Sequence, residues 1–291
     1  MGFHFTVGVM TDVGRVRAIN EDSFSIAPHR GLFMVADGLG GQNAGEIASK
    51  MAIETIEKHL LDRGNPLIGK YREELSPDTN RILSSIRLAN SAIYEAGQRN
   101  PEQQGMGTTI SSVFINGDVM TVAHVGDSRI YLIREGRLVR LTADHSLVEE
   151  QLRRGLITEL EAEKSKHRNI ITRALGAEET IQVDADEEIL LDHDKILLCT
   201  DGLTDMVRDE DISRMVLQNG NDPQKACAEL ADMANAKGGV DNITVILVDC
   251  EKDVPITGGL RRVIRSVRGL FARAKEEGLT GPEEEKGEGA T

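Results

Sequence analysis

The division of the apolar residues into short runs is the feature that most constrains the fold of this chain. No uninterrupted apolar run is longer than five residues, far below the ~18 that a membrane-spanning helix needs. Short runs at 31–36, 195–199 and 243–248 are typical of buried β-strands, and apolar residues alternate over 3–9 as in a half-buried strand. The sequence therefore predicts a water-soluble protein with a large share of β-sheet.

A longer β-rich stretch extends from Ser111 to Leu141. We interpret it as a meander, in which neighbouring antiparallel strands follow one another through tight turns. The predicted turns are Asn116-Gly117-Asp118, Gly126-Asp127-Ser128 and Arg134-Glu135-Gly136-Arg137.

Two segments with helical periodicity lie between the early predicted strands. Apolar residues over 47–60 can share one broad helical face after an Asn43 cap, and those over 82–93 recur at steps of three and four. Further helices are predicted at 146–165, 209–218 and 223–236. Because strands cluster, helices cluster and hairpins outnumber βαβ units, the sequence favours antiparallel sheets with helices on their outer faces.

The composition changes once along the 291 residues, near Val254-Pro255. The segment beyond this point has a Gly-Gly pair, a basic amphipathic stretch over 260–275 and an acidic, Gly-rich end. We therefore predict a globular domain at 1–253 and a separate tail at 254–291, which carries one basic amphipathic helix and a disordered acidic end.

The predicted helix at 260–275 has two possible partners. Its apolar stripe consists of Leu260, Val263, Ile264, Val267, Leu270 and Phe271, and basic residues occupy the rest of its circumference. Such a helix can lie on an anionic membrane surface as a peripheral anchor. It can instead pack its stripe on the acidic body, which would remove that stripe from water. Both interpretations stay open.

The charge balance excludes several classes of protein. Lys and Arg number 34 against 48 Asp and Glu, so the net charge is −14, and such a chain is a poor general binder of nucleic acids.

The N-terminus lacks the pattern of a secretory signal, which makes a cytoplasmic protein the default. The cysteines have no CxxC spacing, and we expect Cys199 and Cys250 to be buried thiols rather than parts of a zinc site or disulfide.

Acidic residues stand where the predicted strands begin or end. Asp37 and Asp201 each end an apolar run and precede a glycine, and Asp127 follows a strand of the predicted meander. The others are Glu21 and Asp22 after the first strand, and Asp241 with Asn242 before the last. A sheet can present such side chains in one cleft, and glycine lets a backbone carbonyl approach an ion closely.

Each of these signals alone has a simpler explanation. A single Asp-Gly is more often a turn, and a single Asp-Asn is more often a cap. Repetition changes the balance, because several carboxylates without paired His or Cys suit the hard cations Mg²⁺ and Mn²⁺. Carboxylates crowded together without a cation would repel one another. The sequence therefore predicts a metal centre.

Eight segments occur in the order that a known family has them. They are RVRAINEDSF (15–24), VADGLGGQNAGEIAS (35–49), GMGTT (105–109), VGDSRIYL (125–132), LTADHS (141–146), NIITRALG (169–176), LLCTDGLTD (197–205) and DNITVILV (241–248). Over residues 5–250 the chain resembles the metal-dependent type 2C serine/threonine protein phosphatases in their compact bacterial form.

The resemblance implies an α+β fold, a four-layer α-β-β-α sandwich with two central antiparallel sheets flanked by helices. It also implies a binuclear Mn²⁺ or Mg²⁺ site in a cleft at one edge. The ligand roles that it implies are Asp37 as the bridge, Asp201 and Asp241 for one ion, Glu21 and the Gly38 carbonyl for the other, and Asp127 with Asp201 for a third, weaker ion.

The resemblance implies further roles around these ligands. Arg17 is expected to bind phosphate through its guanidinium fork, and Asp22 to orient a metal-bound water. Asn242 is expected to support the ligands from behind, and residues 146–168 lie where bacterial members carry a mobile flap. The implied reaction is direct attack of an activated water on phosphorus, without a covalent phosphoenzyme.

Two positions depart from the family pattern. Leu39 stands where eukaryotic members have a histidine proposed as the general acid, and Gln42 stands where bacterial members often have histidine. A serine alkoxide is a poor leaving group and needs a proton. A metal-bound water could supply it, or His145 if the flap folds over, although we favour the interpretation of His145 as a polar residue in a turn.

The function implied by the resemblance is hydrolysis of phosphoserine and phosphothreonine on proteins by a monomeric enzyme that opposes a bacterial Ser/Thr kinase. One alternative is a branch that acts on small-molecule phosphates or on anti-sigma-type regulators. Another is a catalytically dead relative that only binds phosphoproteins. A dead relative would lack a metal aspartate, whereas Asp37, Asp201 and Asp241 are all present. A carbohydrate- or calcium-binding sandwich would not need Arg17.

Overall fold

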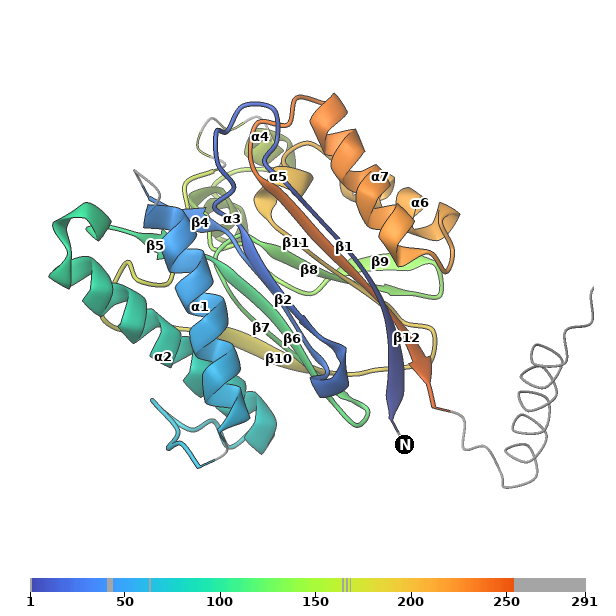
Figure 1. Ribbon diagram of the computed structural model, residues 1–291. Helices are drawn as coiled ribbons and strands as arrows, with labels where there is room; N and C mark the ends of the chain where they lie inside the picture. Colours follow the sequence, from blue (N-terminus) through green and yellow to red (C-terminus); the bar gives the residue numbers. More distant parts are fainter. Residues whose placement is uncertain are drawn as a thin grey trace, which may run out of the picture. The chain divides into compact units, whose positions relative to one another are not determined.

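Two five-stranded antiparallel sheets form the centre of the molecule (Figure 1). The computed structural model describes residues 2–253 except 41–43, 63, 164, 166 and 168. Gly2–Lys252 form one compact unit. The predicted tail, with its helix at 260–275, and the predicted Asn43 cap lie outside the described residues.

The first sheet contains both ends of the described body. Its strand order is β1 (Phe3–Asp12), β12 (Ile243–Lys252), β11 (Lys195–Cys199), β8 (Arg129–Arg134) and β9 (Arg137–Arg140). The order in the second sheet is β10 (Asp184–Ile189), β7 (Val119–Val125), β6 (Ile110–Asn116), β3 (Leu32–Ala36) and β2 (Ser23–Ala27). The short strands β4 (Gly38–Leu39) and β5 (Gly107–Thr108) pair with each other.

The inner faces of the two sheets enclose one hydrophobic layer. It includes Phe33 and Val113 from the second sheet with Leu198 and Ile246 from the first. Phe5 on β1 meets Phe33 edge to face, with ring centroids 5.6 Å apart. The predicted alternation over 3–9 is thereby explained, because one face of β1 packs against this layer.

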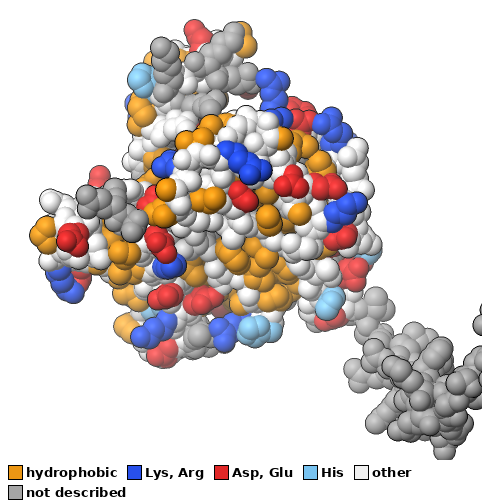
Figure 2. Space-filling view, turned by 45° about the horizontal axis from the view of Figure 1, so that its top comes forward, with side chains coloured by type: hydrophobic (Ala, Val, Ile, Leu, Met, Phe, Trp, Pro, Cys, Tyr) orange, Lys and Arg blue, Asp and Glu red, His pale blue; other side chains and the backbone are white. Residues whose placement is uncertain are grey.

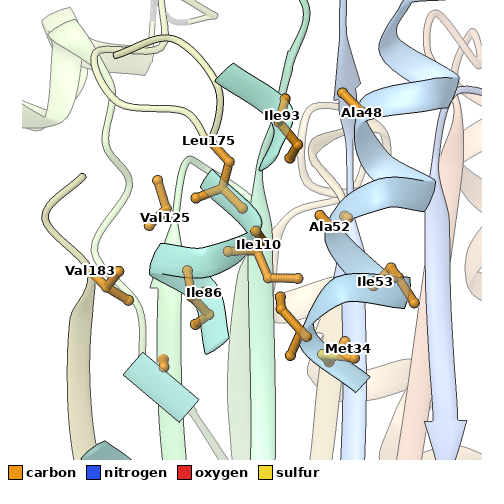
Figure 3. Close-up of a cluster of buried hydrophobic side chains, with 14 of the residues drawn as sticks. Met34, Ala48, Ala52, Ile53, Ile86, Ile93, Ile110, Val125, Leu175 and Val183 are labelled. Carbon is orange, nitrogen blue, oxygen red and sulfur yellow. The ribbon is translucent and has the colours of Figure 1, made fainter. Parts of the chain in front are cut away.

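Long helices cover the outer face of the second sheet. They are α1 (Ala44–Leu61) and α2 (Pro77–Arg99), and Figure 3 shows their side chains converging with those of the sheet. The predicted apolar positions over 82–93 are fully buried in α2. Ser76 caps α2 by accepting a hydrogen bond from the Thr79 backbone, and Pro77 occupies its first turn.

The outer face of the first sheet is covered by α5 (Asp201–Thr204), α6 (Asp209–Gln218) and α7 (Pro223–Ala236). The predicted helices at 209–218 and 223–236 are confirmed with the same bounds. Two helical layers outside two antiparallel sheets make the four-layer α-β-β-α sandwich that the resemblance implied. Two short 3₁₀ helices are η1 (Pro28–Arg30) and η2 (Pro101–Gln103).

The predicted helix at 146–165 is wrong in its continuity. The structure has two short helices there, α3 (Leu147–Arg153) and α4 (Glu159–Glu163). Gly155 between them has φ +70°, a left-handed conformation that ends a helix and that glycine adopts without strain.

The predicted meander is also wrong at one of its three turns. Strands β6 and β7 pair in the second sheet, and β8 and β9 pair in the first. The segment Gly126-Asp127-Ser128 is therefore a crossover from one sheet to the other. Buried apolar strands can pair in either sheet, and a local Gly-Asp-Ser signal does not distinguish a hairpin from a crossover. This crossover places Asp127 between the two sheets.

Two expectations, about membrane-spanning helices and about cysteine, can also be compared with the structure. Within the described ranges, no helix is long and apolar enough to cross a membrane. Cys199 and Cys250 are buried free thiols as predicted, and Cys227 is buried as well.

Candidate metal centre

The segments that carry the predicted acids meet at one end of the sandwich, near the labels β4 and α5 in Figure 1, and their carboxyl groups influence one another electrostatically. Asp37 follows β3 and Asp127 lies in the crossover between the sheets, whereas Asp201 begins α5 directly after β11. Asp241 precedes β12, and Glu21 and Asp22 precede β2. The structure thus brings together all of the carboxylates that the sequence singled out.

Burial moves the protonation of these carboxyl groups away from that of ordinary aspartates. It raises the pKa of Asp22 to about 7 and that of Asp127 to about 8, and the negative charge of Asp201 adds to both shifts. Burial, followed by the charges of Asp201, Asp22 and Asp127, raises the pKa of Asp37 well above its usual range. Asp37 and Asp201 also share a hydrogen bond. Carboxylates this close are compensated either by protons or by a cation.

Three oxygens in this group have no hydrogen-bond partner. They are Oδ1 of Asp22, Oδ1 of Asp127 and Oδ1 of Asp201, all buried. Buried polar atoms in native proteins normally have a hydrogen-bond partner, so several unpaired carboxylate oxygens in one place indicate a ligand site. A set of carboxylate oxygens without His or Cys fits the oxygen preference of Mn²⁺ and Mg²⁺.

Glu21 lies at the N-terminus of α1. Its carboxylate accepts hydrogen bonds from the backbone N–H groups of Gly45 and Glu46, whereas burial raises its pKa. A Cβ at Gly45 would lie 2.7 Å from Glu21 Oε1, and a Cβ at Gly38 would lie 2.3 Å from the Gly45 carbonyl oxygen. Only glycines allow these segments to approach Glu21 so closely, and helix N-termini favour a negative charge there.

Asp22 is held on one side by hydroxyl groups from the other sheet. Its Oδ2 accepts hydrogen bonds from Thr200 Oγ1 at 2.9 Å and from Thr244 Oγ1 at 2.7 Å. Its Oδ1 is left without a partner. Asp22 is thus fixed in orientation with one oxygen still able to accept a hydrogen bond.

Asn242 lies behind this group and fastens the loop that precedes Glu21. Its Oδ1 accepts a hydrogen bond from the Glu21 backbone N–H at 2.8 Å. Its Nδ2 donates to the carbonyl oxygens of Val13 at 3.0 Å and Ile19 at 2.9 Å.

Arg17 stands at the open side of the carboxylate group. Its Nη2 lies 2.7 Å from Asp241 Oδ2, and its side chain is 50% exposed. The charges of Asp241, Asp37 and Glu21 all favour the charged guanidinium. The arrangement therefore places one accessible cation next to a cluster of buried acids.

The sequence interpretation missed several residues that shape the site. Asp205 exerts the strongest effect of any charged neighbour on the pKa of Asp201, which burial raises to about 6. Thr109 Oγ1 accepts a hydrogen bond from the Asp37 backbone N–H at 2.9 Å, and Thr108 Oγ1 donates to the Asp37 carbonyl oxygen at 2.8 Å. These residues lie inside the family segments GMGTT and LLCTDGLTD, and their place in those segments was the one sequence signal that could have pointed to them.

His145 binds Gly126 and Asp184. Its Nδ1 accepts a hydrogen bond from the Gly126 backbone N–H at 3.0 Å, and its Nε2 lies 3.2 Å from Asp184 Oδ2. The side chain is buried, and its present partners give it no role as a proton donor to a bound phosphate; whether it acts as an acid stays a prediction. Gln42, the other position discussed for an acid, lies outside the described residues.

Comparisons with known proteins agree with this arrangement. The profile of the family "Protein phosphatase 2C" matches residues 10–243. Protein phosphatase PhpP of Streptococcus pneumoniae serotype 2 (strain D39) is 36% identical over 250 residues, which cover 85% of this chain and 98% of that protein.

Solved structures are similar over the same region. The Mycobacterium tuberculosis serine/threonine phosphatase PstP/Ppp has a TM-score of 0.76 and 32% identity, over 87% of this chain and 100% of that chain. The catalytic domain of PstP in complex with two manganese ions has a TM-score of 0.74 and 33% identity, over 86% of this chain and 100% of that chain.

The chain therefore belongs to the protein phosphatase 2C family. The resemblance found in the sequence is confirmed, and the molecule is an enzyme of the protein serine/threonine phosphatase class.

Proposed function

We propose that this enzyme hydrolyses phosphoserine and phosphothreonine on proteins with a water activated at a binuclear Mn²⁺ or Mg²⁺ centre, and that it opposes a bacterial Ser/Thr kinase in signal transduction. The observation that carries the proposal is the group of buried carboxylates with partnerless oxygens beside Arg17. The manganese ions in the related PstP structure support the choice of metal.

The proposed ligand assignment keeps the roles that the family resemblance implies, and the positions of the acids support it. Asp37 would bridge the two ions, since its carboxyl group hydrogen-bonds to Asp201 and the charges of Asp22 and Asp127 raise its pKa. Asp201 and Asp241 would hold one ion. Glu21 and the Gly38 carbonyl, which approach each other across Gly45, would hold the other. Asp127 with Asp201 would hold a third ion more weakly, and the partnerless Oδ1 of each supports this role.

Around this centre the side chains have separate tasks. When bound, the ions supply a nucleophilic water near neutral pH and stabilise negative charge on the phosphate. Arg17 binds the phosphate oxygens, because its half-exposed guanidinium can turn from Asp241 toward a ligand in the opening. Asp22 orients the attacking water with Oδ1, since Thr200 and Thr244 hold its other oxygen.

We infer that the enzyme acts as a cytoplasmic monomer on phosphoprotein substrates, with no nucleic-acid partner. The net charge of −14 supports the absence of a nucleic-acid partner. On the face in Figure 2, acidic and basic side chains are interspersed rather than gathered into one basic area. A peripheral membrane contact through 260–275, or packing of that segment on the body, belongs to the same proposal.

A panel of phosphopeptides tests the substrate class. Matched peptides containing phospho-Ser, phospho-Thr or phospho-Tyr are incubated with the full chain in Mn²⁺, in Mg²⁺ and in EDTA. We expect release of phosphate from the first two peptides only, and only with a metal. Hydrolysis of small phosphate esters without activity on any peptide would favour the small-molecule branch, and binding of the peptides without hydrolysis would indicate a phosphoprotein-binding relative.

A further inference from the structure

A polar cluster lies next to the crossover that carries Asp127. It consists of His124 on β7, Asp184 on β10, and His145 and Arg173 from the two connections that flank the predicted flap at 146–168. The rings of His124 and His145 stack, with centroids 4.7 Å apart. His145 is buried, and the roles proposed above use none of these residues.

The hydrogen bonds assign different roles to the two ring nitrogens of His145. A backbone N–H can only donate, so the contact from Gly126 at 3.0 Å makes Nδ1 of His145 an acceptor. The Gly126 contact leaves Nε2 as the donor to Asp184 Oδ2 at 3.2 Å. Arg173 Nη1, which can only donate, therefore binds Asp184 and makes no hydrogen bond to this nitrogen. His124 Nε2 donates to the Ala143 carbonyl oxygen at 2.8 Å by the same reasoning.

This cluster has the spacing of a metal site but not the chemistry. Ligand atoms of His124, His145 and Asp184 lie within 4.8 Å of one another. However, a protonated Nε2 has no lone pair for a metal. Arg173 Nη1 lies 3.1 Å from that nitrogen and 2.9 Å from Asp184 Oδ1, so a cation already neutralises the carboxylate. Consistently, the hydrogen bond from His145 and the charge of Arg173 lower the pKa of Asp184, although burial alone would raise it.

The cluster ties the two ends of the flap to the second sheet. The Thr172 backbone N–H donates to the His145 carbonyl oxygen at 2.7 Å, and the Leu147 N–H donates to Ile170 O at 2.9 Å. The two ends therefore run side by side. His145 at one end and Arg173 at the other both contact Asp184, which lies on the edge strand β10.

His145 also holds both backbone polar groups of Gly126. Its side chain accepts from the Gly126 N–H, and its own backbone N–H donates to the Gly126 carbonyl oxygen at 2.9 Å. Gly126 has φ +107°, and a Cβ there would lie 2.5 Å from Thr109 Cγ2. The residue that follows this clamped position is Asp127.

We propose that His145 is a positioning residue that couples the flap to Asp127. The inference rests on the proposed function, in which Asp127 is a ligand of the weaker third ion. Asp184 and Arg173 orient the imidazole, the imidazole holds Gly126, and Gly126 sets the direction of the Asp127 carboxylate. Affinity for the weaker ion then depends on a side chain that touches neither metal nor substrate.

Two substitutions at His145 separate its hydrogen bonds. In His145→Asn, the amide oxygen can take the place of Nδ1 and still accept from Gly126. In His145→Gln, the longer side chain can reach Asp184 but leaves the Gly126 N–H without an acceptor. Asp184→Asn removes the charge that orients the imidazole and binds Arg173. The matched control is Asp194→Asn, which breaks the comparable Arg134–Asp194 pair. Asp194 precedes β11, whereas the candidate ligand Asp201 follows that strand.

Three readouts are measured on the full chain. They are Mn²⁺ binding by calorimetry, kcat and KM on a small phosphate ester, and the rate of tryptic cleavage at Arg153 and Arg154 in the flap. We expect His145→Gln to weaken the weakest Mn²⁺ site about tenfold or more, in the range typical of outer-sphere substitutions, and to lower kcat with little change in KM. His145→Asn should stay within about threefold of wild type at that site. Asp184→Asn should weaken the same site and accelerate cleavage of the flap.

Three results would overturn the inference. The first is equal weak-site affinity in wild type and His145→Gln, with reduced thermal stability alone. The second is an equal loss in Asp194→Asn, which would indicate a general effect of destabilisation. The third is a wild type that hydrolyses phosphate with only two bound ions, which would leave the proposed function standing. A wild type that neither binds Mn²⁺ nor hydrolyses phosphate would overturn the proposed function and the Asp127 coupling, whereas tryptic cleavage needs no metal and decides the attachment of the flap by itself.

Discussion

Asp37 illustrates how a single residue depends on segments far apart in the sequence. Its backbone is held by Thr108 and Thr109, and its carboxylate contacts Asp201. Like charges and burial both raise its pKa, so the folded chain bears an electrostatic cost at this position unless protons or a cation compensate it.

Replacing this carboxylate should separate turnover from stability. Asp37→Asn should lower kcat on a small phosphate ester by at least about a thousandfold, since removal of a bridging ligand disturbs both ions. The metal-free variant should melt at a higher temperature than the metal-free wild type, because one repelling charge is gone. Enzyme assays in Mn²⁺ and thermal melts in EDTA provide both numbers. Asp232→Asn on the exposed side of α7 is the control, and near-normal turnover in Asp37→Asn would contradict the assignment.

The raised pKa values also predict how stability depends on pH. An aspartate in the unfolded chain titrates near 4, whereas in the folded chain the pKa of Asp22 is about 7 and that of Asp127 about 8. Between about pH 4 and pH 8 the folded state therefore binds more protons than the unfolded state, and its stability falls as the pH rises.

Melting temperatures at pH 5 and pH 8 test this sign. In EDTA we expect the lower melting temperature at pH 8. In saturating Mn²⁺ we expect the difference to shrink or reverse, because metal ions bind the ionised carboxylates and replace the protons. The same pH dependence with and without Mn²⁺ would mean that these aspartates do not bind the ion.

At the scale of elements, the N-terminus of α1 and the loop before β2 form one unit. The backbone N–H groups of Gly45 and Glu46 hold the Glu21 carboxylate, and Ser49 Oγ donates to the Glu21 carbonyl oxygen at 2.6 Å. The helix thus places a charged ligand candidate at its positive end.

A methyl group at Gly45 should disrupt this unit. In Gly45→Ala the new Cβ would lie 2.7 Å from Glu21 Oε1 and 2.8 Å from the Gly38 carbonyl carbon, so both groups must shift. We expect Mn²⁺ affinity to fall about tenfold or more, measured by calorimetry. Gly97→Ala within α2 is the matched control, because its Cβ would come no closer than 3.2 Å to a neighbouring atom and alanine favours a helix. Equal Mn²⁺ affinities in the two variants would contradict the placement of this ion.

At the scale of the whole molecule, the compact unit Gly2–Lys252 already contains every residue of the candidate site. The segment at 254–291 lies outside the described residues, and its amphipathic pattern over 260–275 is known from the sequence alone. A docking role for that pattern therefore stays a prediction.

Deletion of residues 255–291 tests it. We expect hydrolysis of a small phosphate ester to stay within about twofold of the full chain, because the site lies in the body. Either binding to anionic liposomes or the melting temperature should fall, and the one that falls identifies the surface on which the helix docks. Loss of activity on the small ester would show that the tail is part of the catalytic unit.

The sequence by itself determined many of the elements and the acidic residues of the candidate site. The α2 face, the bounds of α6 and α7, and the aspartates at strand ends were all predicted, because periodicity and turn signals are local properties of the chain. The order of eight segments added the family and its sandwich.

Only the tertiary structure decided how these parts meet. It made Gly126-Asp127-Ser128 a crossover instead of a hairpin, since apolar strands buried on both faces can pair in either sheet. It divided the helix predicted at 146–165, turned His145 toward Asp184, and surrounded Asp22 with Thr200 and Thr244. These contacts join residues that are tens to hundreds of positions apart in the chain. No local pattern records them, because each depends on the packing of both sheets at once.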